Sequence, residues 1–424
     1  MSAITVTIII LAVAAVLFVS EVVPVGVTSL SVSTALFLTG ILNAQTAFSG
    51  LVDSNVILFA GMFVVAGALF ETGLADEIGQ NIVRAFGKSE RKLLAAVMIV
   101  SAILSIFLSN IAVTASLMPV VISIADSAGY ARSKFLLPLA IATALGGTIS
   151  LVGTPPNLIV HSYLEKSGMQ GFGFLEFAWY GIPLTVVGII YMLFIGVKLL
   201  PERPLTGEEL EKAAQRVQAL KNADKTKQYI AAIVFALTVT GMFFNRQIGL
   251  PLQVVAVIGA LSLVYMKVLT DKQAYRSIDW NTIFLTGGMM PMAAALDKTG
   301  AGKLISNWVL TAFGDNPSPL FITLAIFTVG AVLTQFMSNV ALAALLGPIA
   351  IGVAVEMGVN PKAMILAASF ASSCAFVTPV GTPATAIVFG PGKYHFVDFV
   401  KAGAPLLIIS GLLAAVILPL AWPF

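Results

Sequence analysis

The stretch Gly153-Thr154-Pro155-Pro156-Asn157 interrupts a long apolar segment over residues 134–162, and Gly381-Thr382-Pro383 interrupts a second one over residues 362–390. Proline removes a backbone donor and glycine admits unusual dihedral angles, so each helix is expected to unwind near the middle of its apolar run. Unwound carbonyls can coordinate a cation, and half-helix N-termini present N–H groups to an anion. A single break of this kind is explained by a packing kink, but two matching breaks predict a transport site.

The amino-acid composition indicates the solvent in which these broken helices lie. Of the 424 residues, 58% are hydrophobic and 10% are charged, whereas soluble domains carry about 25% charged residues. The net charge of +3 gives no basic excess for nucleic acid, and one cysteine with two histidines cannot build a disulfide framework, a zinc cluster or a haem site. We therefore expect a protein of the lipid bilayer with no nucleic-acid partner.

Two apolar segments, over 91–125 and 317–355, are too long for one crossing of about 30 Å of hydrocarbon. Each contains a polar pair in its middle, Ser109-Asn110 and Ser338-Asn339. An asparagine is tolerated at this depth only where it is buried in protein or lines a watery cavity. Both segments are therefore predicted to be re-entrant helical hairpins with Ser-Asn at the tip. Ten further apolar segments lie near 3–20, 24–42, 53–71, 134–162, 179–200, 228–245, 250–269, 281–298, 362–390 and 403–422.

Landmarks in the first half of the chain return in the second half in the same order. The pairs are Asn55 and Asn281, Asn110 and Asn339, and Gly153 and Gly381, at offsets of 226, 229 and 228 residues. Such repetition predicts an all-α integral membrane protein of two repeats, 1–200 and 228–424, joined by a charged linker over 201–227. A hairpin returns to the side it entered from, so each repeat has five transmembrane helices, and this odd number makes the repeats inverted.

The distribution of lysine and arginine supports this topology. With the N-terminus outside, 18 of the 23 basic residues fall on the inner face, the side that positive charge prefers. The linker is then cytoplasmic, and both chain ends lie outside a cell (inner) membrane. The five outer residues are Lys166, Arg246, Lys298, Lys303 and Lys362.

Hydroxyl and amide side chains recur at the two hairpin tips. Ser105 lies one helical turn before Ser109-Asn110, and Thr334 lies one turn before Ser338-Asn339. Such oxygens, with free backbone carbonyls, are hard ligands that suit Na⁺. The alternative is that the hydroxyls bond back to their own helices and that each asparagine caps the next helix. Duplication of the whole arrangement favours the binding site.

No lysine or arginine falls at mid-membrane, so an anion would depend on helix ends, hydroxyls, amides and bound cations. This predicts coupling to a cation. Proton coupling would call for an acid buried at mid-membrane, whereas the acidic residues fall at span ends, where solvated carboxylates are expected. These residues are Glu21, Asp53, Glu71, Asp126 and Asp297.

At these motifs the chain resembles the divalent anion/sodium symporter (DASS) family of the ion transporter superfamily. The resemblance covers nearly the whole chain and includes Ser20-Glu21-Val22-Val23-Pro24, both Ser-Asn tips and both helix breaks. It implies a homodimer in which a transport domain slides past a scaffold, as in an elevator. It also implies two sodium sites, one at Ser105, Asn110 and Gly153, the other at Thr334, Asn339 and Gly381. By the same resemblance, the anion would be bound by Ser109, Asn110, Thr154, Ser338, Asn339, Thr382 and Pro383.

Two departures from the family pattern bear on the substrate. The threonine that usually follows Ser-Asn is replaced by Ile111 at one tip and by Val340 at the other. In dicarboxylate transporters of the family those threonines help to hold carboxylates, so sulfate is an alternative to a di- or tricarboxylate. The predicted function is sodium-coupled symport of such a divalent anion. The alternatives are a proton-coupled or exchanging anion carrier, an anion channel, and a membrane enzyme, although the spans hold no nucleophile, base and orienting group together.

Overall fold

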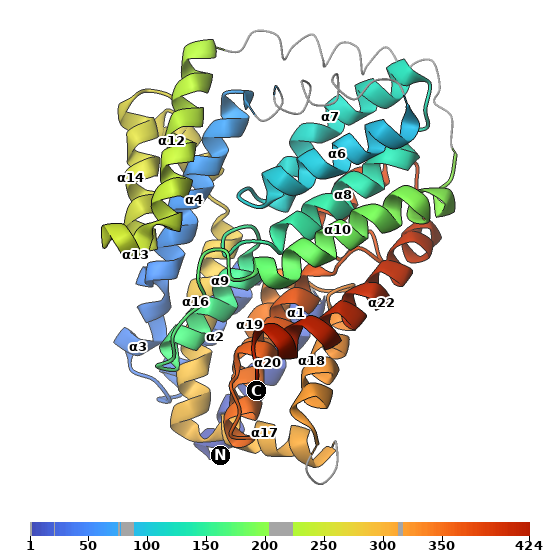
Figure 1. The fold of residues 1–424 in the computed structure, drawn as a ribbon. Helices are drawn as coiled ribbons and strands as arrows, with labels where there is room; N and C mark the ends of the chain where they lie inside the picture. Colours follow the sequence, from blue (N-terminus) through green and yellow to red (C-terminus); the bar gives the residue numbers. More distant parts are fainter. Residues whose placement is uncertain (1, 21, 75–76, 78–88, 203–223, 313–316) are drawn as a thin grey trace.

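The computed structural model describes residues 2–20, 22–74, 77, 89–202, 224–312 and 317–424, and its regular elements there are all helices (Figure 1). The helices of the first half are α1 (Ala3–Ser20), α2 (Val25–Leu38), α3 (Ala44–Phe48), the 3-10 helix η1 (Ser49–Val52), α4 (Ser54–Glu71), α6 (Glu90–Ser105), α7 (Asn110–Ala128), α8 (Ser133–Gly147), α9 (Pro155–Lys166), α10 (Ala178–Phe194) and the 3-10 helix η2 (Gly196–Leu199). The helices of the second half are α12 (Lys225–Phe243), α13 (Asn245–Ile248), α14 (Leu252–Tyr265), α15 (Asp271–Ser277), α16 (Trp280–Thr299), α17 (Ala301–Ala312), α18 (Pro319–Leu333), α19 (Asn339–Glu356), α20 (Lys362–Ser373), α21 (Pro383–Phe389) and α22 (Phe396–Ala421).

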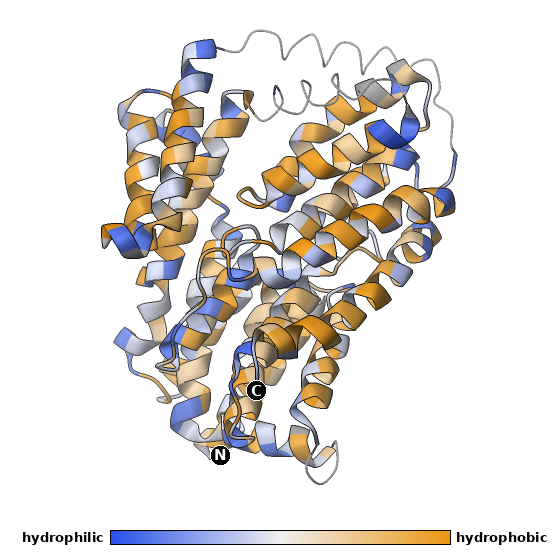
Figure 2. Ribbon diagram, viewed as in Figure 1, coloured by the Kyte–Doolittle hydropathy of each residue, from blue (hydrophilic) through white to orange (hydrophobic). Residues whose placement is uncertain are grey.

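The surface of this helical assembly is apolar. Figure 2 shows hydrophobic residues along most of the helices, and large side chains such as Val16, Leu237 and Leu412 are more than 60% exposed. Exposed apolar side chains of this kind are solvated by lipid. In the described residues, four helical runs are long and apolar enough to cross a membrane, and shorter apolar helices accompany them. The four are Ala44–Glu71, Lys225–Phe243, Asn339–Glu356 and Phe396–Ala421.

Each of the two overlong apolar segments forms a pair of helices joined by a short turn at its Ser-Asn. α6 ends at Ser105 and α7 begins at Asn110, while α18 ends at Leu333 and α19 begins at Asn339. Ser109 and Ser338 are the N-cap residues of the second helix in each pair, and their backbone angles are nearly the same. The chain therefore turns back at the predicted places.

Both predicted helix breaks are present. The first separates α8 from α9 between Gly147 and Pro155, and the second separates α20 from α21 between Ser373 and Pro383. The side-chain amide of Asn157 donates hydrogen bonds to two carbonyls of the first break, those of Ser150 at 2.7 Å and Gly147 at 3.3 Å. Its Oδ1 accepts from the Ser369 hydroxyl at 2.7 Å, so one buried asparagine bonds the first break to α20.

The helices pack as two groups (Figure 1). In the flanking group, α2 packs along α16 and α4 along α14, together with α1 and α12. In the hairpin group, α8 packs on α6, α7 and α10, and α20 packs on α18, α19 and α9, with α22 against α10. Glycine permits the closest of these approaches, because a Cβ at Gly146 of α8 would lie 2.2 Å from the Ala102 carbonyl oxygen of α6.

The order hairpin, broken helix and long helix occurs in α6–α10 and again in α18–α22. The inverted relation of the halves and their boundaries at 1–200 and 228–424 stay predictions. Most of the predicted linker over 201–227 lies outside the described residues.

Candidate functional site

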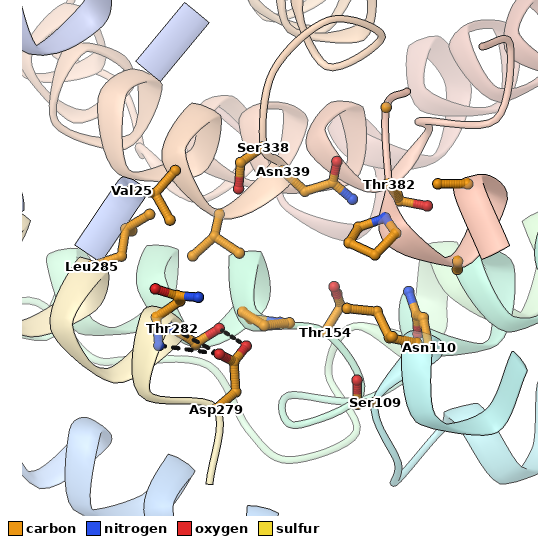
Figure 3. Close-up of a pocket in the computed structure, with 18 of the residues that line it drawn as sticks. Val25, Ser109, Asn110, Thr154, Asp279, Thr282, Leu285, Ser338, Asn339 and Thr382 are labelled. Atoms are coloured by element: carbon orange, nitrogen blue, oxygen red, sulfur yellow. Dashed lines mark hydrogen bonds between the residues drawn. The ribbon is translucent and has the colours of Figure 1, made fainter. Parts of the chain in front are cut away.

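A cavity of about 1010 Å³ lies where the two groups of helices meet. It is lined by both hairpin tips, by both helix breaks, and by the first residues of α2 and α16. In Figure 3, Val25, Asp279 and Leu285 lie on one side of it, and Asn110 and Thr382 on the opposite side. All seven residues predicted to bind the anion line this cavity: Ser109, Asn110, Thr154, Ser338, Asn339, Thr382 and Pro383.

Three long helices begin at the wall of the cavity. Ser109, Thr154 and Ser338 are the N-caps of α7, α9 and α19, and none of these hydroxyls makes a capping hydrogen bond to its own helix. The first backbone N–H groups of α7 and α19 have no partner within their helices, whereas α9 begins with Pro155 and Pro156, which carry no N–H. At all three ends the helix dipole places partial positive charge. Three positive ends and three hydroxyls at one cavity are suited to an anion.

Two of the three predicted sodium ligands of the first half, Ser105 and Asn110, are in contact with one another. The buried Ser105 hydroxyl donates to Asn110 Oδ1 at 2.7 Å. Gly153 has no room for a side chain, because a Cβ there would lie 2.6 Å from the Gly147 carbonyl oxygen and 2.9 Å from that of Ile106. Side-chain and backbone oxygens therefore lie close together around Asn110 and Gly153. A small cation could be coordinated by these oxygens in place of the hydrogen bond between Ser105 and Asn110.

The second half repeats these contacts. Thr334 Oγ1 lies 3.0 Å from Asn339 Oδ1 and 2.8 Å from the Ser372 carbonyl oxygen. A Cβ at Gly381 would lie 3.0 Å from the Thr334 carbonyl oxygen. The predicted residues of each sodium site are therefore neighbours, although Ser105, Gly153 and Thr334 lie behind the wall of the large cavity rather than on it.

Two hydroxyls that the sequence analysis did not predict, those of Ser150 and Thr378, hydrogen-bond to the two hairpin tips. Ser150 donates to the Ile106 carbonyl, and Thr378 donates to that of Gln335 at 2.6 Å. Each hydroxyl also accepts a backbone N–H, from Gly153 at 3.0 Å and from Gly381 at 3.2 Å respectively. Each hydroxyl lies three residues before the glycine of its break, a signal that the repeat would have revealed.

The start of α16 was also missed. Asp279 lines the cavity with Asn281 and Thr282, and its carboxylate accepts bonds from the Thr282 hydroxyl at 2.6 Å and from the Asn281 N–H at 3.1 Å. The match of Asn55 with Asn281 marked this region of the sequence, but Asp279 was not among the predicted residues. The walls beside it are largely apolar, and they include Ile111 and Val340.

The expectation that span-end carboxylates are solvated is wrong for Asp126. Its side chain is 6% exposed and pairs with Arg132, with Nε donating at 2.9 Å and Nη2 at 2.7 Å. The turn after α7 brings Arg132 back over the end of the helix, so that a two-pronged ion pair replaces water. Asp53 is also paired, with Lys166 at 3.2 Å.

These features define a membrane transporter. The chain shares its fold with the solved YdaH transporter of Alcanivorax borkumensis, with a TM-score of 0.61 over 91% of this chain and 87% of that one, at 16% identity. The chain belongs to the CitMHS family, described as citrate transporters, whose model matches residues 15–369 and 249–424. The resemblance to anion transporters that the motifs predicted is confirmed, and the family is one of transporters rather than enzymes.

Curated relatives are similar over nearly their whole length. An uncharacterized transporter of Haemophilus influenzae is 30% identical over 431 residues, which are 97% of this chain and 90% of that protein. The sodium-dependent dicarboxylate transporter SdcS of Staphylococcus aureus strain USA300 is 27% identical over 444 residues, which are 96% and 84% of the two chains. The protein is thus a multi-pass membrane transporter of the CitMHS family.

Proposed function

We propose that the protein is a sodium-coupled symporter of a divalent anion, a di- or tricarboxylate or sulfate. The observation that carries the proposal is the convergence of α7, α9 and α19 on one cavity, each with an N-cap hydroxyl that does not cap its own helix. The cavity has no lysine or arginine among its described lining residues. Helix ends then supply part of the positive charge that an anion needs, and bound Na⁺ supplies the rest.

Sodium is proposed to bind at two sites, Ser105, Asn110 and Gly153 in the first half, and Thr334, Asn339 and Gly381 in the second. Support comes from the matching hydroxyl-to-amide contacts, at 2.7 Å and 3.0 Å. Each asparagine also lines the anion cavity, so one side chain can contact both solutes. The sodium-dependent dicarboxylate transporter SdcS, similar over 96% of this chain, supports the same coupling ion and substrate class.

An elevator-type movement is proposed for alternating access. The hairpin group would slide along the flanking group, and a homodimer would hold the flanking groups of the two protomers fixed. The separate packing of the two groups and the position of the cavity between them support this movement. Both chain ends are proposed to lie outside, and the linker 201–227 in the cytoplasm.

The experiment measures sodium-dependent uptake by the variants Asn110→Ala and Asn339→Ala in proteoliposomes. Each is expected to lose at least about tenfold in uptake, because the change removes a ligand shared by Na⁺ and the anion. Asn43→Ala is the matched control, since Asn43 is exposed and caps the short helix α3 away from the cavity. Uptake that survives both cavity variants would show that the site is assigned wrongly.

A proton-coupled or exchanging carrier is the second candidate, and Asp279 favours it as a titratable side chain in the cavity wall. Uptake that ignores Na⁺ but follows a pH gradient would select it. A channel would instead pass currents far above carrier turnover and would not accumulate the anion.

A further inference from the structure

A second cavity, of about 580 Å³, adjoins the first between α4 and α7. Phe63, Ser109, Ile111 and Asp279 line both cavities, and the second one extends from the hairpin tip toward Glu71 at the end of α4. An anion that moves between the two cavities passes Asp279.

The ionisable side chains described at these two cavities are acidic. Among the described residues that line the two cavities, Asp279 and Glu71 are the ionisable ones, and neither lysine nor arginine accompanies them. Glu71 accepts a hydrogen bond from the neutral Gln273 side chain at 2.7 Å, and it has no ion-pair partner among the residues that the structure describes. A carboxylate in the wall of a cavity for anions must discriminate between solutes by their charge.

The carboxylate of Asp279 cannot turn away from the cavity. It is the N-cap of α16 and accepts from the Asn281 and Thr282 N–H groups and from the Thr282 hydroxyl. The dipole of α16 offsets about half of its charge, so a net negative potential remains. Figure 3 shows Asp279 on the side of the cavity opposite Asn110.

The repeat provides a contrasting residue. Asp53 caps α4 as Asp279 caps α16, and in both places the carboxylate accepts from the N–H of the asparagine two residues later. Asp53 is paired with Lys166 and lines neither cavity, whereas Asp279 has no ion-pair partner in the described part of the chain. Of these two equivalent N-cap residues, Asp279 is therefore the one whose negative charge acts on the cavity.

Resting on the proposed anion-transport function, we propose that Asp279 determines charge specificity. Two negative groups of a substrate are held at the helix N-termini of the hairpin group, and a third negative group is repelled by Asp279 on the opposite wall. The cavity accordingly prefers dianions to trianions of the same size.

The test compares two competitors that differ by one carboxylate, glutarate and propane-1,2,3-tricarboxylate, at pH 8, where the second is trivalent. Each is titrated against uptake of whichever labelled anion the wild-type protein accumulates among succinate, citrate and sulfate. The variant is Asp279→Asn, because asparagine caps a helix as well as aspartate does but carries no charge. Asp279→Ser is a second neutral capping variant in case the first folds poorly.

In both neutral variants the inhibition constant of the trianion, relative to that of the dianion, is expected to fall on the order of fivefold, because the repulsion between Asp279 and the third carboxylate is removed. Asp53→Asn and Asp279→Glu should leave this ratio at the wild-type value. An unchanged ratio in the neutral Asp279 variants, or an equal shift in Asp53→Asn, would overturn the proposal. Accumulation of an anion that neither competitor inhibits would also overturn it, whereas accumulation of no anion at all would defeat the proposed function instead.

Discussion

Ser105 and Thr334 occupy the same place in the two halves, each with its hydroxyl within hydrogen-bond distance of the asparagine five residues later. Both side chains are fully buried. A buried hydroxyl that lacks a partner destabilises the fold, so each must keep a bond to the asparagine, to a carbonyl or to a cation. This constraint makes the two residues sensitive probes of sodium binding.

Replacing Thr334 by valine keeps its shape but removes the oxygen, and we expect the Na⁺ concentration for half-maximal uptake to rise about tenfold, as loss of one oxygen contact of about 1.4 kcal/mol implies. Thr334→Ser retains the oxygen and should keep the wild-type sodium dependence. Uptake measured over a range of Na⁺ concentrations distinguishes the variants. Equal sodium dependence of the two would remove Thr334 from the site.

Glu176, in the turn before α10, fixes three parts of the hairpin group. It accepts from the Gly173 N–H at 2.7 Å, from Trp422 Nε1 at 2.8 Å and from Lys362 Nζ at 3.0 Å. Burial alone would raise the pKa of this carboxyl, but these three donors together lower it below its ordinary value of 4.5. The ionised form therefore stabilises the fold at neutral pH, and that contribution is lost as the pH falls below 4.5 through the lowered pKa.

Glu176→Gln should destabilise the protein by about 1 kcal/mol at pH 7, and the difference from wild type should shrink in acid. Thermal unfolding in detergent at pH 7 and at pH 4 measures it. Glu202→Gln is the control, because that carboxylate is exposed where it meets Lys134. A deficit for Glu176→Gln that is the same at both pH values would contradict this role of the charge.

At the scale of single residues, the sequence predicts those that occur at equivalent positions in both halves of the chain. Asn110 and Asn339, which both line the cavity, were predicted because the same Ser-Asn arrangement occurs twice in the chain. Asp279 could not be predicted, since a carboxylate at the end of an apolar run has the pattern of a solvated one, and only the fold brings it to the cavity. The bond between Ser369 and Asn157 joins residues 212 positions apart, and no local pattern predicts such a contact.

At the scale of elements, proline, glycine and Ser-Asn explain why the turns and breaks were predictable. These residues impose local backbone costs on a helix wherever it packs, so the interruptions of α6–α7, α8–α9, α18–α19 and α20–α21 were evident from the sequence. The short helices α3, α13 and α15 were not predicted. They have 5, 4 and 7 residues, too few for an apolar period to appear.

The contact between hairpin and broken helix is tightest at Gly146. A Cβ there would meet the Ala102 backbone of α6 at 2.2 Å, so Gly146→Ala must push α8 away from α6. We expect a loss of about 2 kcal/mol in stability, seen as a lower melting temperature in detergent. Gly390→Ala is the matched control, because nothing lies within 4 Å of a Cβ there and its backbone suits alanine. Equal melting temperatures for the two variants would contradict the packing.

At the scale of the whole molecule, the predicted topology places Lys303 outside and Lys272 inside. Both residues are exposed in the structure, and the chain's single cysteine, Cys374, is 1% exposed. An impermeant maleimide added to intact cells should label Lys303→Cys, whereas Lys272→Cys should react only after the membrane is opened. The unsubstituted protein is the background. The reverse pattern would invert the topology.

The all-helical character and the order of hairpin and broken helix in each half were predictable from the sequence, whereas the inverted repeat and the orientation in the membrane stay predictions. The packing of α2 on α16 and of α4 on α14, and hence the outline of the cavity, arises from contacts between distant segments. Apolar periodicity does not encode such pairings, because a helix in lipid is apolar on every side.

Sodium-driven accumulation of an anion tests the central claim most directly. Purified protein in liposomes is given labelled succinate, citrate or sulfate, with an inward Na⁺ gradient or with K⁺ in its place. The two sites of hydroxyl, amide and glycine predict that one of the three anions accumulates above its external concentration only with Na⁺, and that Asn110→Ala with Asn339→Ala abolishes this accumulation. Accumulation that is equal in Na⁺ and K⁺ would contradict sodium coupling and the role of both hairpin tips in it.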